Sequence, residues 1–409
     1  MQQTATPEAL GFDSGRLARI DSHFASYVDS GKLAGWQIVV ARRGEIVHAS
    51  TYGLRDREAG LAVEADTLWR LYSMTKPIVS VAAMSLWEQG KFQLTDELSR
   101  YLPEFADVQV MLRGSITSQV TAPPREPIRL WHLLTHTSGL TAGFLNVSVV
   151  DALHRAQGYE MLTMPVGQDL AAACKAWAAL PLLFEPGTAW SYSVATDVLG
   201  RVLEVVTGKS LDAVVDEQVL GPLGMSDTRW FVAAPQHERL AAIYTPDAAS
   251  GMAMRADRYR DEVLSRPQFL GGGGGLICTA ADYHRFTTML LRGGELDGTR
   301  VLGNRTLRYM TRNHLPRGAD LGAMNTGGFA ETNFDGIGFG LGFAVVDDAI
   351  PGKTLSSQGE FFWGGLASTA FWVDPVEEVT ALLFTQLVPS STYPLRPQLR
   401  QLVYSALVD

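Results

Sequence analysis

The stretch Ser73-Met74-Thr75-Lys76-Pro77 places a serine and a lysine three positions apart at the expected start of a helix. Apolar residues at three- and four-residue spacing predict this helix over residues 72–89, and Gly90 is placed to end it. Residues three positions apart share one helix face, so the Lys76 amine can reach back to the Ser73 hydroxyl. A serine beside a candidate base is a candidate nucleophile.

A Ser-x-x-Lys pair is a weak signal when it stands alone. The chain has 25 serines and 6 lysines among 409 residues, so chance placement gives about 0.4 such pairs. The remainder of the sequence therefore has to decide whether this pair is catalytic.

The composition describes an ordinary globular protein of enzyme size. Hydrophobic residues make up 46% of the chain and charged residues 19%, and a chain of 409 residues usually divides its core between two domains. The net charge of −9 and the absence of Lys/Arg runs argue against a nucleic-acid partner.

The ends and cysteines of the chain predict a cytoplasmic protein. Residues 1–20 have no basic region followed by an apolar one, so no secretory signal is expected. No stretch approaches 18 uninterrupted apolar residues, so no membrane association is expected. Cys174 and Cys278 stand in apolar surroundings and are interpreted as buried thiols, which fits a reducing compartment.

Strand-like segments lie near both ends of the chain, and helix-like segments lie between them. A β-hairpin is predicted by two apolar runs, residues 36–42 and 46–49, on either side of a charged glycine turn. The other expected strands are residues 339–346, 364–373 and 379–387. The other expected helices are residues 128–135, 168–180, 194–207, 211–220 and 395–407.

This order of elements suggests one sheet assembled from both chain ends, with a helical domain inserted. We therefore expect an α/β domain formed by residues 1–95 and 261–409, and a mainly helical domain formed by residues 96–260.

Motifs for three other chemistries are incomplete. No G-x-S-x-G occurs, so the nucleophile elbow of α/β-hydrolases is missing. His132 and His136 have the spacing of zinc metalloproteases but lack the glutamate of H-E-x-x-H, so turn hydrogen bonds explain them better. The run from Gly271 to Gly275 lacks the Lys-Ser/Thr of a phosphate loop and is interpreted as a flexible turn or a close backbone approach. No metal and no cofactor are expected.

Six motifs are informative because they occur in a fixed order. They are Ser73-Met74-Thr75-Lys76-Pro77, Leu133-Leu134-Thr135-His136-Thr137-Ser138-Gly139-Leu140, Phe184-Glu185-Pro186-Gly187, Tyr192-Ser193-Val194, Gly274-Gly275-Leu276-Ile277-Cys278-Thr279-Ala280-Ala281-Asp282-Tyr283 and Trp363-Gly364-Gly365.

This ordered set resembles the family VIII carboxylesterases, the esterase branch of the serine β-lactamase and penicillin-binding-protein superfamily, similar to class C β-lactamases. The resemblance covers nearly the whole chain. It implies an α+β fold of the β-lactamase/transpeptidase type, an α/β sandwich in which helices flank an antiparallel sheet. It also implies an active site in the cleft between that part and the inserted helical domain.

Carried over by position, the resemblance implies that Ser73 is the acylated nucleophile and that Lys76 and Tyr192 are its acid–base partners. Lysine and tyrosine ordinarily have pKa values near about 10, so each needs a special environment to act as a base at neutral pH. We expect the two to work as one coupled unit, with Tyr192 protonating the leaving alcohol and then helping to activate the deacylating water. The backbone N–H groups of Ser73 and Leu366 are expected to form the oxyanion hole.

Two departures from the β-lactamase pattern affect the expected substrate. Trp363 replaces the lysine of a Lys-Thr-Gly strand, which removes a cation that would face a substrate carboxylate. We expect Trp363 to be an apolar pocket wall, and Gly364 and Gly365 to let the substrate carbonyl approach the strand edge. Val194 replaces the asparagine of a Tyr-x-Asn motif and cannot supply its amide. Both changes favour neutral esters over anionic β-lactams.

The sequence therefore predicts a serine carboxylesterase that hydrolyses neutral short- to medium-chain esters, with a small-molecule ester as its partner. An acyltransferase that uses the same acyl-enzyme, a weak β-lactamase or D-amidase, and a non-catalytic penicillin-binding-like protein stay open as alternatives. His136 is expected to be structural. Tyr244, Asp257 and Phe269 lie at positions compatible with a flexible pocket wall, but no signal in the sequence raises them above surface residues.

Overall fold

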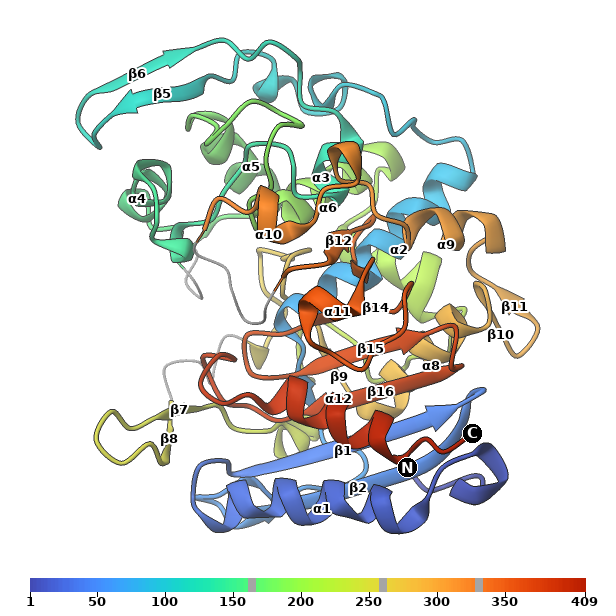
Figure 1. Ribbon diagram of the computed structural model, residues 1–409. Coiled ribbons are helices and arrows are strands. Elements are labelled where there is room, and N and C mark those ends of the chain that lie inside the picture. The colour runs from blue at the N-terminus through green and yellow to red at the C-terminus, as the bar shows by residue number, and fades with distance from the viewer. Residues whose placement is uncertain (161–166, 257–262, 328–333) are drawn as a thin grey trace.

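The computed structural model describes residues 1–160, 167–256, 263–327 and 334–409. An eight-stranded antiparallel sheet contains strands from both ends of the chain and occupies the middle and lower part of the view in Figure 1. In spatial order the strands are β12 (Ile337–Phe339), β13 (Ala344–Val346), β14 (Phe361–Gly364), β15 (Ala370–Asp374), β16 (Val379–Phe384), β1 (Gly35–Arg42), β2 (Glu45–Asp56) and β3 (Leu61–Ala62). The pairing of β16 with β1 joins the two ends, as the order of elements in the sequence predicts.

The hairpin of β1 and β2 confirms the prediction made from residues 36–49. Arg43 and Gly44 form its turn, and their φ angles of 56° and 84° are both in the left-handed region. A two-residue turn of this kind matches the twist of the flanking strands but needs positive φ at both positions. Gly44 adopts that conformation without steric cost.

Two of the predicted strands are wrong in the same way. Residues 339–346 and 364–373 were each expected to form one strand, but each contains a turn between two strands. Gly342 and Ser368 turn the chain with φ angles of 95° and 68°. Most residues of both turns are buried, Ser368 and Thr369 included, so the pattern of buried positions does not mark where the chain turns.

Each face of the sheet is covered by helices (Figure 1). Along β1, Ile38 and Val40 belong to the core beneath α1 (Ser14–Asp29) and α12 (Leu395–Ala406). Val39 and Ala41 point to the opposite core, which contains α2 (Thr75–Glu88) and α8 (Ala280–Leu291). This alternation follows from the two-residue period of a strand.

The middle of the chain is mainly helical, as predicted, but with shorter elements. Its helices are α3 (Leu130–Leu134), α4 (Val149–Ala156), α5 (Leu170–Ala178), α6 (Ala195–Thr207) and α7 (Leu211–Val215), the last followed by a π-helical turn at Asp216–Leu220. It also contains a projecting hairpin that the sequence analysis did not predict, β5 (Val110–Gly114) and β6 (Gln119–Ala122). The domain boundary expected after residue 260 lies outside the described residues, and the boundary after residue 95 stays a prediction.

The remaining elements are short. They are β4 (Trp69–Arg70) paired with β9 (Ile277–Cys278), β7 (Tyr244–Pro246) paired with β8 (Ala253–Arg255), β10 (Glu295–Leu296) paired with β11 (Thr299–Arg300), and the helices α9 (Asn304–Met310), α10 (Leu321–Met324) and α11 (Ala349–Gly352). Among the described residues, no helix has the length and apolar character needed to cross a membrane.

A buried polar network holds α12 against the sheet. The Tyr404 hydroxyl lies 2.5 Å from Glu360 Oε2 and 2.6 Å from Asp374 Oδ2, and both carboxylates are fully buried. Arg400 Nη2 donates to Glu360 Oε1 at 2.7 Å. Burial raises the pKa of Glu360, and the Arg400 charge opposes this shift. Because separating these buried groups would leave the carboxylates unsatisfied, the network favours one orientation of the helix.

Replacing Tyr404→Phe should lower the free energy of unfolding by about 1–3 kcal/mol, because two buried carboxylates lose a hydrogen-bond partner while the ring stays in place. Urea unfolding followed by circular dichroism measures the change. Tyr309→Phe, at an exposed tyrosine of α9, is the matched control. Equal stability of the two variants would show that the network does not hold α12.

Candidate active site

Ser73 lies at the junction of a short strand and a buried helix. It belongs to a 3₁₀ turn, Tyr72–Met74, which follows β4 and leads directly into α2. Tyr72 has a φ of 46°, in the left-handed region that a residue other than glycine rarely adopts. Strain of this kind persists where the surrounding fold imposes it, commonly at functional sites. The helix expected over residues 72–89 is therefore confirmed, with the serine in the turn just before α2.

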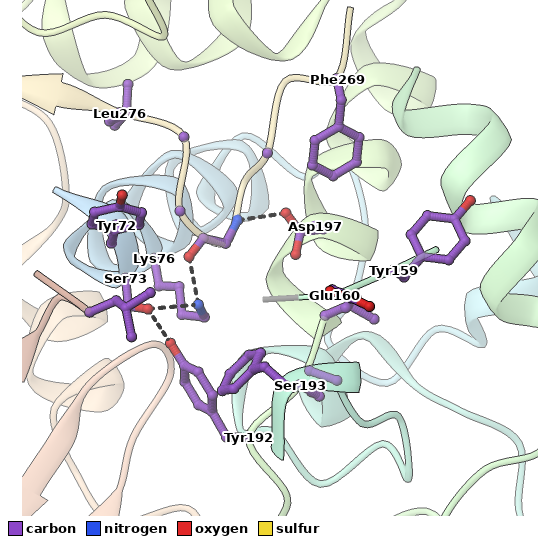
Figure 2. Close-up of a pocket in the computed structure, with 18 of the residues that line it drawn as sticks. Tyr72, Ser73, Lys76, Tyr159, Glu160, Tyr192, Ser193, Asp197, Phe269 and Leu276 are labelled. Carbon is purple, nitrogen blue, oxygen red and sulfur yellow. Dashed lines mark hydrogen bonds between the residues drawn. The ribbon is translucent and has the colours of Figure 1, made fainter. Parts of the chain in front are cut away.

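The structure brings together the three residues expected to carry the chemistry (Figure 2). Tyr192 Oη lies 2.5 Å from Ser73 Oγ, and Lys76 Nζ lies 3.4 Å from the same oxygen. Lys76 Nζ is also 4.4 Å from the centre of the Tyr192 ring, a cation–π contact. Both partners are buried, Lys76 with 5% of its surface exposed and Tyr192 with 3%. Either can exchange a proton with Ser73 Oγ in this geometry.

Aromatic rings fix the position of the Tyr192 phenol. The ring of Trp363 is 5.6 Å from it and the ring of His136 is 5.1 Å from it, measured between centroids. Trp363 is buried behind Tyr192, whereas Gly364 lines the pocket beside it. Contact between Trp363 and the substrate stays a prediction. The contact that the structure shows is between the Trp363 ring and the Tyr192 phenol, and it holds the phenol toward Ser73.

His136 has a structural environment, as expected. Its Nδ1 lies 3.0 Å from Ser193 Oγ, and the side chain is buried. Burial, followed by the charge of Lys76, lowers the pKa of His136 well below its ordinary value, so the ring is neutral at pH 7. His132 Nδ1 accepts the Arg129 N–H at 2.9 Å at the start of α3, which confirms the interpretation as a turn contact. No group of three or more metal-binding side chains occurs within the described ranges.

A pocket of about 820 Å³ opens beside Ser73 (Figure 2). Val194, Gly364 and Leu366, three of the residues expected to contact substrate, line it. An aromatic wall extends away from the nucleophile and consists of Tyr159, Trp177 and Phe269, whose rings contact one another in sequence. The pocket can therefore enclose an apolar group of substantial size.

The three residues to which the sequence analysis assigned no role lie in different environments or outside the described residues. Phe269 is part of the pocket wall, one of the two places that the sequence analysis left open for it. Tyr244 is 2% exposed and donates its hydroxyl hydrogen to Glu58 at 2.7 Å, so it is buried rather than on the surface. Asp257 lies outside the described residues. Nothing in the local pattern separates Phe269 from an exposed loop residue, because the wall forms only when distant segments meet.

The two expected oxyanion donors lie at facing turns. Within the described part of the chain, the Leu366 N–H donates to no backbone carbonyl. Leu366 belongs to the turn between β14 and β15, which contacts the Ser73 turn. A Cβ atom at Gly365 would lie 2.2 Å from the Leu71 carbonyl oxygen, so only glycine permits this approach. Gly365 thus brings two backbone segments together, whereas the sequence analysis expected it to admit the substrate carbonyl.

The glycine run is a close backbone approach that positions Lys76. Lys76 Nζ donates to the Gly273 carbonyl at 2.6 Å, and the Gly273 N–H donates to Asp197 Oδ1 at 2.8 Å. A Cβ atom at Gly273 would lie 2.6 Å from Asp197 Oδ2, and one at Gly272 would lie 2.6 Å from the Thr196 carbonyl. Of the two interpretations offered for this run, the structure favours the second.

Asp197 is a site residue that the sequence analysis missed. Its carboxylate lies in the first turn of α6, beyond Tyr192, and lines the pocket. Burial raises its pKa, and the nearby Lys76 charge opposes the shift. An aspartate at a helix start is ordinarily interpreted as a contribution to helix stability, which conceals its contact with a glycine some 76 positions away.

Known proteins share both the sequence and the architecture of this chain. A family model described as Beta-lactamase matches residues 20–405. Protein Rv1367c from Mycobacterium tuberculosis is 37% identical over 373 residues, covering 88% of each chain. Esterase EstB from Burkholderia gladioli is 34% identical over 420 residues, covering 98% of each chain.

A solved structure gives the same result. EstCE1, described as a hydrolase with promiscuous acyltransferase activity, superposes with a TM-score of 0.79 and is 29% identical; the match covers 95% of this chain and 99% of that one. The fold class expected from the sequence is confirmed. On the extent of the family match and the identity to full-length relatives, the chain belongs to the β-lactamase family.

Proposed function

We propose that the protein is a serine carboxylesterase of the family VIII type, with an S-x-x-K motif that acts through an acyl-enzyme on Ser73. The observation that carries this proposal is the position of Ser73 Oγ, within reach of both Tyr192 Oη and Lys76 Nζ at the edge of an apolar pocket. The similarity to Esterase EstB over nearly the full chain supports it.

The proposed reaction has two steps, acylation of Ser73 and hydrolysis of the acyl-enzyme. Ser73 Oγ attacks the ester carbonyl and gives its proton to the Lys76/Tyr192 pair, while the N–H groups of Ser73 and Leu366 bind the oxyanion. Collapse breaks the bond to the alcohol, which leaves with a proton from Tyr192. Water then attacks the acyl-enzyme, gives a proton to the same pair, and releases the carboxylic acid and the free Ser73 hydroxyl.

The pocket supports neutral and fairly bulky esters as substrates. Val194 lines it where a β-lactamase would place an amide, and Trp363 stands in the sequence where a β-lactamase would place a lysine. The volume of about 820 Å³ exceeds what an acetyl or butyryl group fills and lies within the range of pockets for drug-sized ligands. Medium-chain and larger acyl or alcohol groups are therefore accommodated.

A second candidate function is acyl transfer to an alcohol instead of water. It uses the same acyl-enzyme, and the combined hydrolase and acyltransferase description of EstCE1 favours it as a side activity. β-Lactamase or D-amidase activity is a weaker candidate, because the charged and amide contacts described above are missing. A non-catalytic binding role fits least, since Ser73, Lys76 and Tyr192 are all in contact.

We also propose a cytoplasmic location. Cys174 and Cys278 are both free and buried. Burial raises the pKa of each thiol well above its ordinary value, so both are unreactive, structural thiols. Free thiols of this kind are usual in a reducing compartment, which supports the proposal.

Ser73→Ala should lower kcat for p-nitrophenyl butyrate by at least about 10⁴-fold, because the covalent route is lost and only binding and the oxyanion hole remain. A fluorophosphonate probe should add mass to the native protein and none to the variant. Ser22→Ala, at an exposed serine of α1, should keep full activity and labelling. Substantial turnover by Ser73→Ala would exclude the proposed nucleophile.

Substrate preference should follow the apolar pocket. p-Nitrophenyl butyrate has two more methylene groups than the acetate, and burying each contributes about 0.8 kcal/mol, so kcat/KM should rise about tenfold. Nitrocefin, an anionic β-lactam, should react at least about tenfold more slowly than butyrate, because a charged contact is missing. The proposal fails if nitrocefin is the better substrate in steady-state assays.

Acyl transfer should appear when a second alcohol competes with water for the acyl-enzyme. Adding 1-butanol to the p-nitrophenyl butyrate reaction should produce butyl butyrate, measured by gas chromatography, in a ratio to butyrate that rises with alcohol concentration. Nitrophenol release with no butyl butyrate at any alcohol concentration would leave hydrolysis as the sole activity on this substrate.

A further inference from the structure

We propose that Arg396 is a positioning residue of the oxyanion hole, which acts by orienting and polarising the peptide group that links Gly365 to Leu366. This inference rests on the proposed function, since that peptide carries the Leu366 N–H. Arg396 comes from α12, far from every motif that the sequence analysis used.

The Arg396 guanidinium binds the turn between β14 and β15 from the side on which α12 lies. Arg396 Nη2 donates to the Gly365 carbonyl at 2.7 Å and to the Thr369 carbonyl at 3.0 Å. The same turn is closed by the Gly365 N–H, which donates to the Thr369 carbonyl at 2.9 Å. One cation therefore bonds both ends of the turn that presents Leu366 to the pocket.

This contact reaches the oxyanion hole through a single peptide group. In a trans peptide the C=O and the following N–H are coplanar and point in opposite directions. The Gly365 oxygen faces Arg396, and the Leu366 N–H at the other side of the same group is directed away from it. A charged donor on the oxygen draws electron density from the peptide and makes its N–H a stronger donor, because hydrogen bonds in series polarise one another.

The local sequence is matched to this arginine. A Cβ atom at Gly364 would lie 2.3 Å from Arg396 Cζ, so any side chain there would displace the guanidinium. Gly364 is therefore required for the arginine to reach the turn. Close contacts within the protein therefore explain both glycines that follow Trp363. Gly364 leaves room for the Arg396 guanidinium, and Gly365 leaves room for the Leu71 carbonyl.

Arg396 occupies a position that is unfavourable for stability alone. It lies in the first turn of α12, where the positive end of the helix dipole repels a cation. Burial lowers its pKa to about 10; Tyr192 opposes the shift and Arg400 adds to it. The group is still charged at neutral pH. The hydrogen bonds from Arg396 to the turn between β14 and β15 explain why a charged residue occupies this position.

The placement also fits the preference for neutral substrates. The lysine expected in a β-lactamase would face the substrate, and Trp363 removes it. Arg396 supplies a positive charge on the far side of the strand, where it supports developing negative charge on the carbonyl oxygen. Strand β14, all of whose residues are described, presents no cation of its own to the substrate side of the pocket.

The test compares Arg396→Met with Arg396→Lys in the full-length protein, using p-nitrophenyl butyrate. Arg396→Met should lower kcat by about 10- to 100-fold, somewhat less than the loss of a direct oxyanion donor, with KM changed less than about threefold. Arg396→Lys keeps the charge but replaces the planar group whose Nη2 donates to both carbonyls with a tetrahedral ammonium on a different stem, and should lose about three- to tenfold. Arg308→Met, at an exposed arginine of α9, should leave both constants unchanged.

A second measurement separates this effect from a general loss of structure. n-Butylboronic acid forms a tetrahedral adduct with a catalytic serine and places an oxygen in the oxyanion hole. Its inhibition constant should rise in Arg396→Met by the same factor as kcat falls, while the melting curve shows one cooperative transition. If Arg396→Met does not fold, the Arg396→Lys comparison stands in its place.

Two results would overturn the inference. One is a kcat within twofold of the native value in both Arg396 variants. The other is a fall in kcat with unchanged boronic acid inhibition. A native protein that binds the boronic acid but hydrolyses no ester would contradict the proposed function and not the role of Arg396, because the adduct reports the oxyanion hole directly.

Discussion

The pairing of β1 with β16 is the constraint on which the active site depends. It joins the first strand of the chain to the last, and the strands before β16 then bring β14 and its turn close to the Ser73 turn. Gly365 allows the final approach, because its missing side chain leaves room for the Leu71 carbonyl. Two backbone N–H groups that are distant in sequence thereby face one pocket. Without closure of the sheet, the proposed nucleophile would lack the proposed oxyanion hole.

Much of this arrangement could be predicted from the sequence. The hairpin around Arg43 and Gly44, the final strand and the final helix all have local signals, namely turn chemistry and hydrophobic period. The trio of Ser73, Lys76 and Tyr192 emerged from the order of motifs, each weak by itself. Their positions within hydrogen-bonding distance agree with that interpretation.

The remaining features depend on contacts that no local pattern encodes. The turns inside residues 339–346 and 364–373 are mostly buried, so burial does not distinguish them from the strands on either side. Asp197 and Arg396 each resemble an ordinary charged residue at a helix start, and their roles arise from glycine loops elsewhere in the chain. The sequence motif draws attention to Gly364 and Gly365, but the groups that require glycine there could be identified only from the fold.

The wide separation of the site residues has a consequence for folding. Tyr192 is 119 positions from Ser73, and Gly273 is 197 positions from Lys76. Closing such long loops costs chain entropy before any contact compensates for it, so these contacts form late. A partly folded chain with its helices in place would hold the same side chains without a working site. Recovery of turnover during refolding therefore reports closure of the sheet, whereas far-ultraviolet circular dichroism reports the earlier helices.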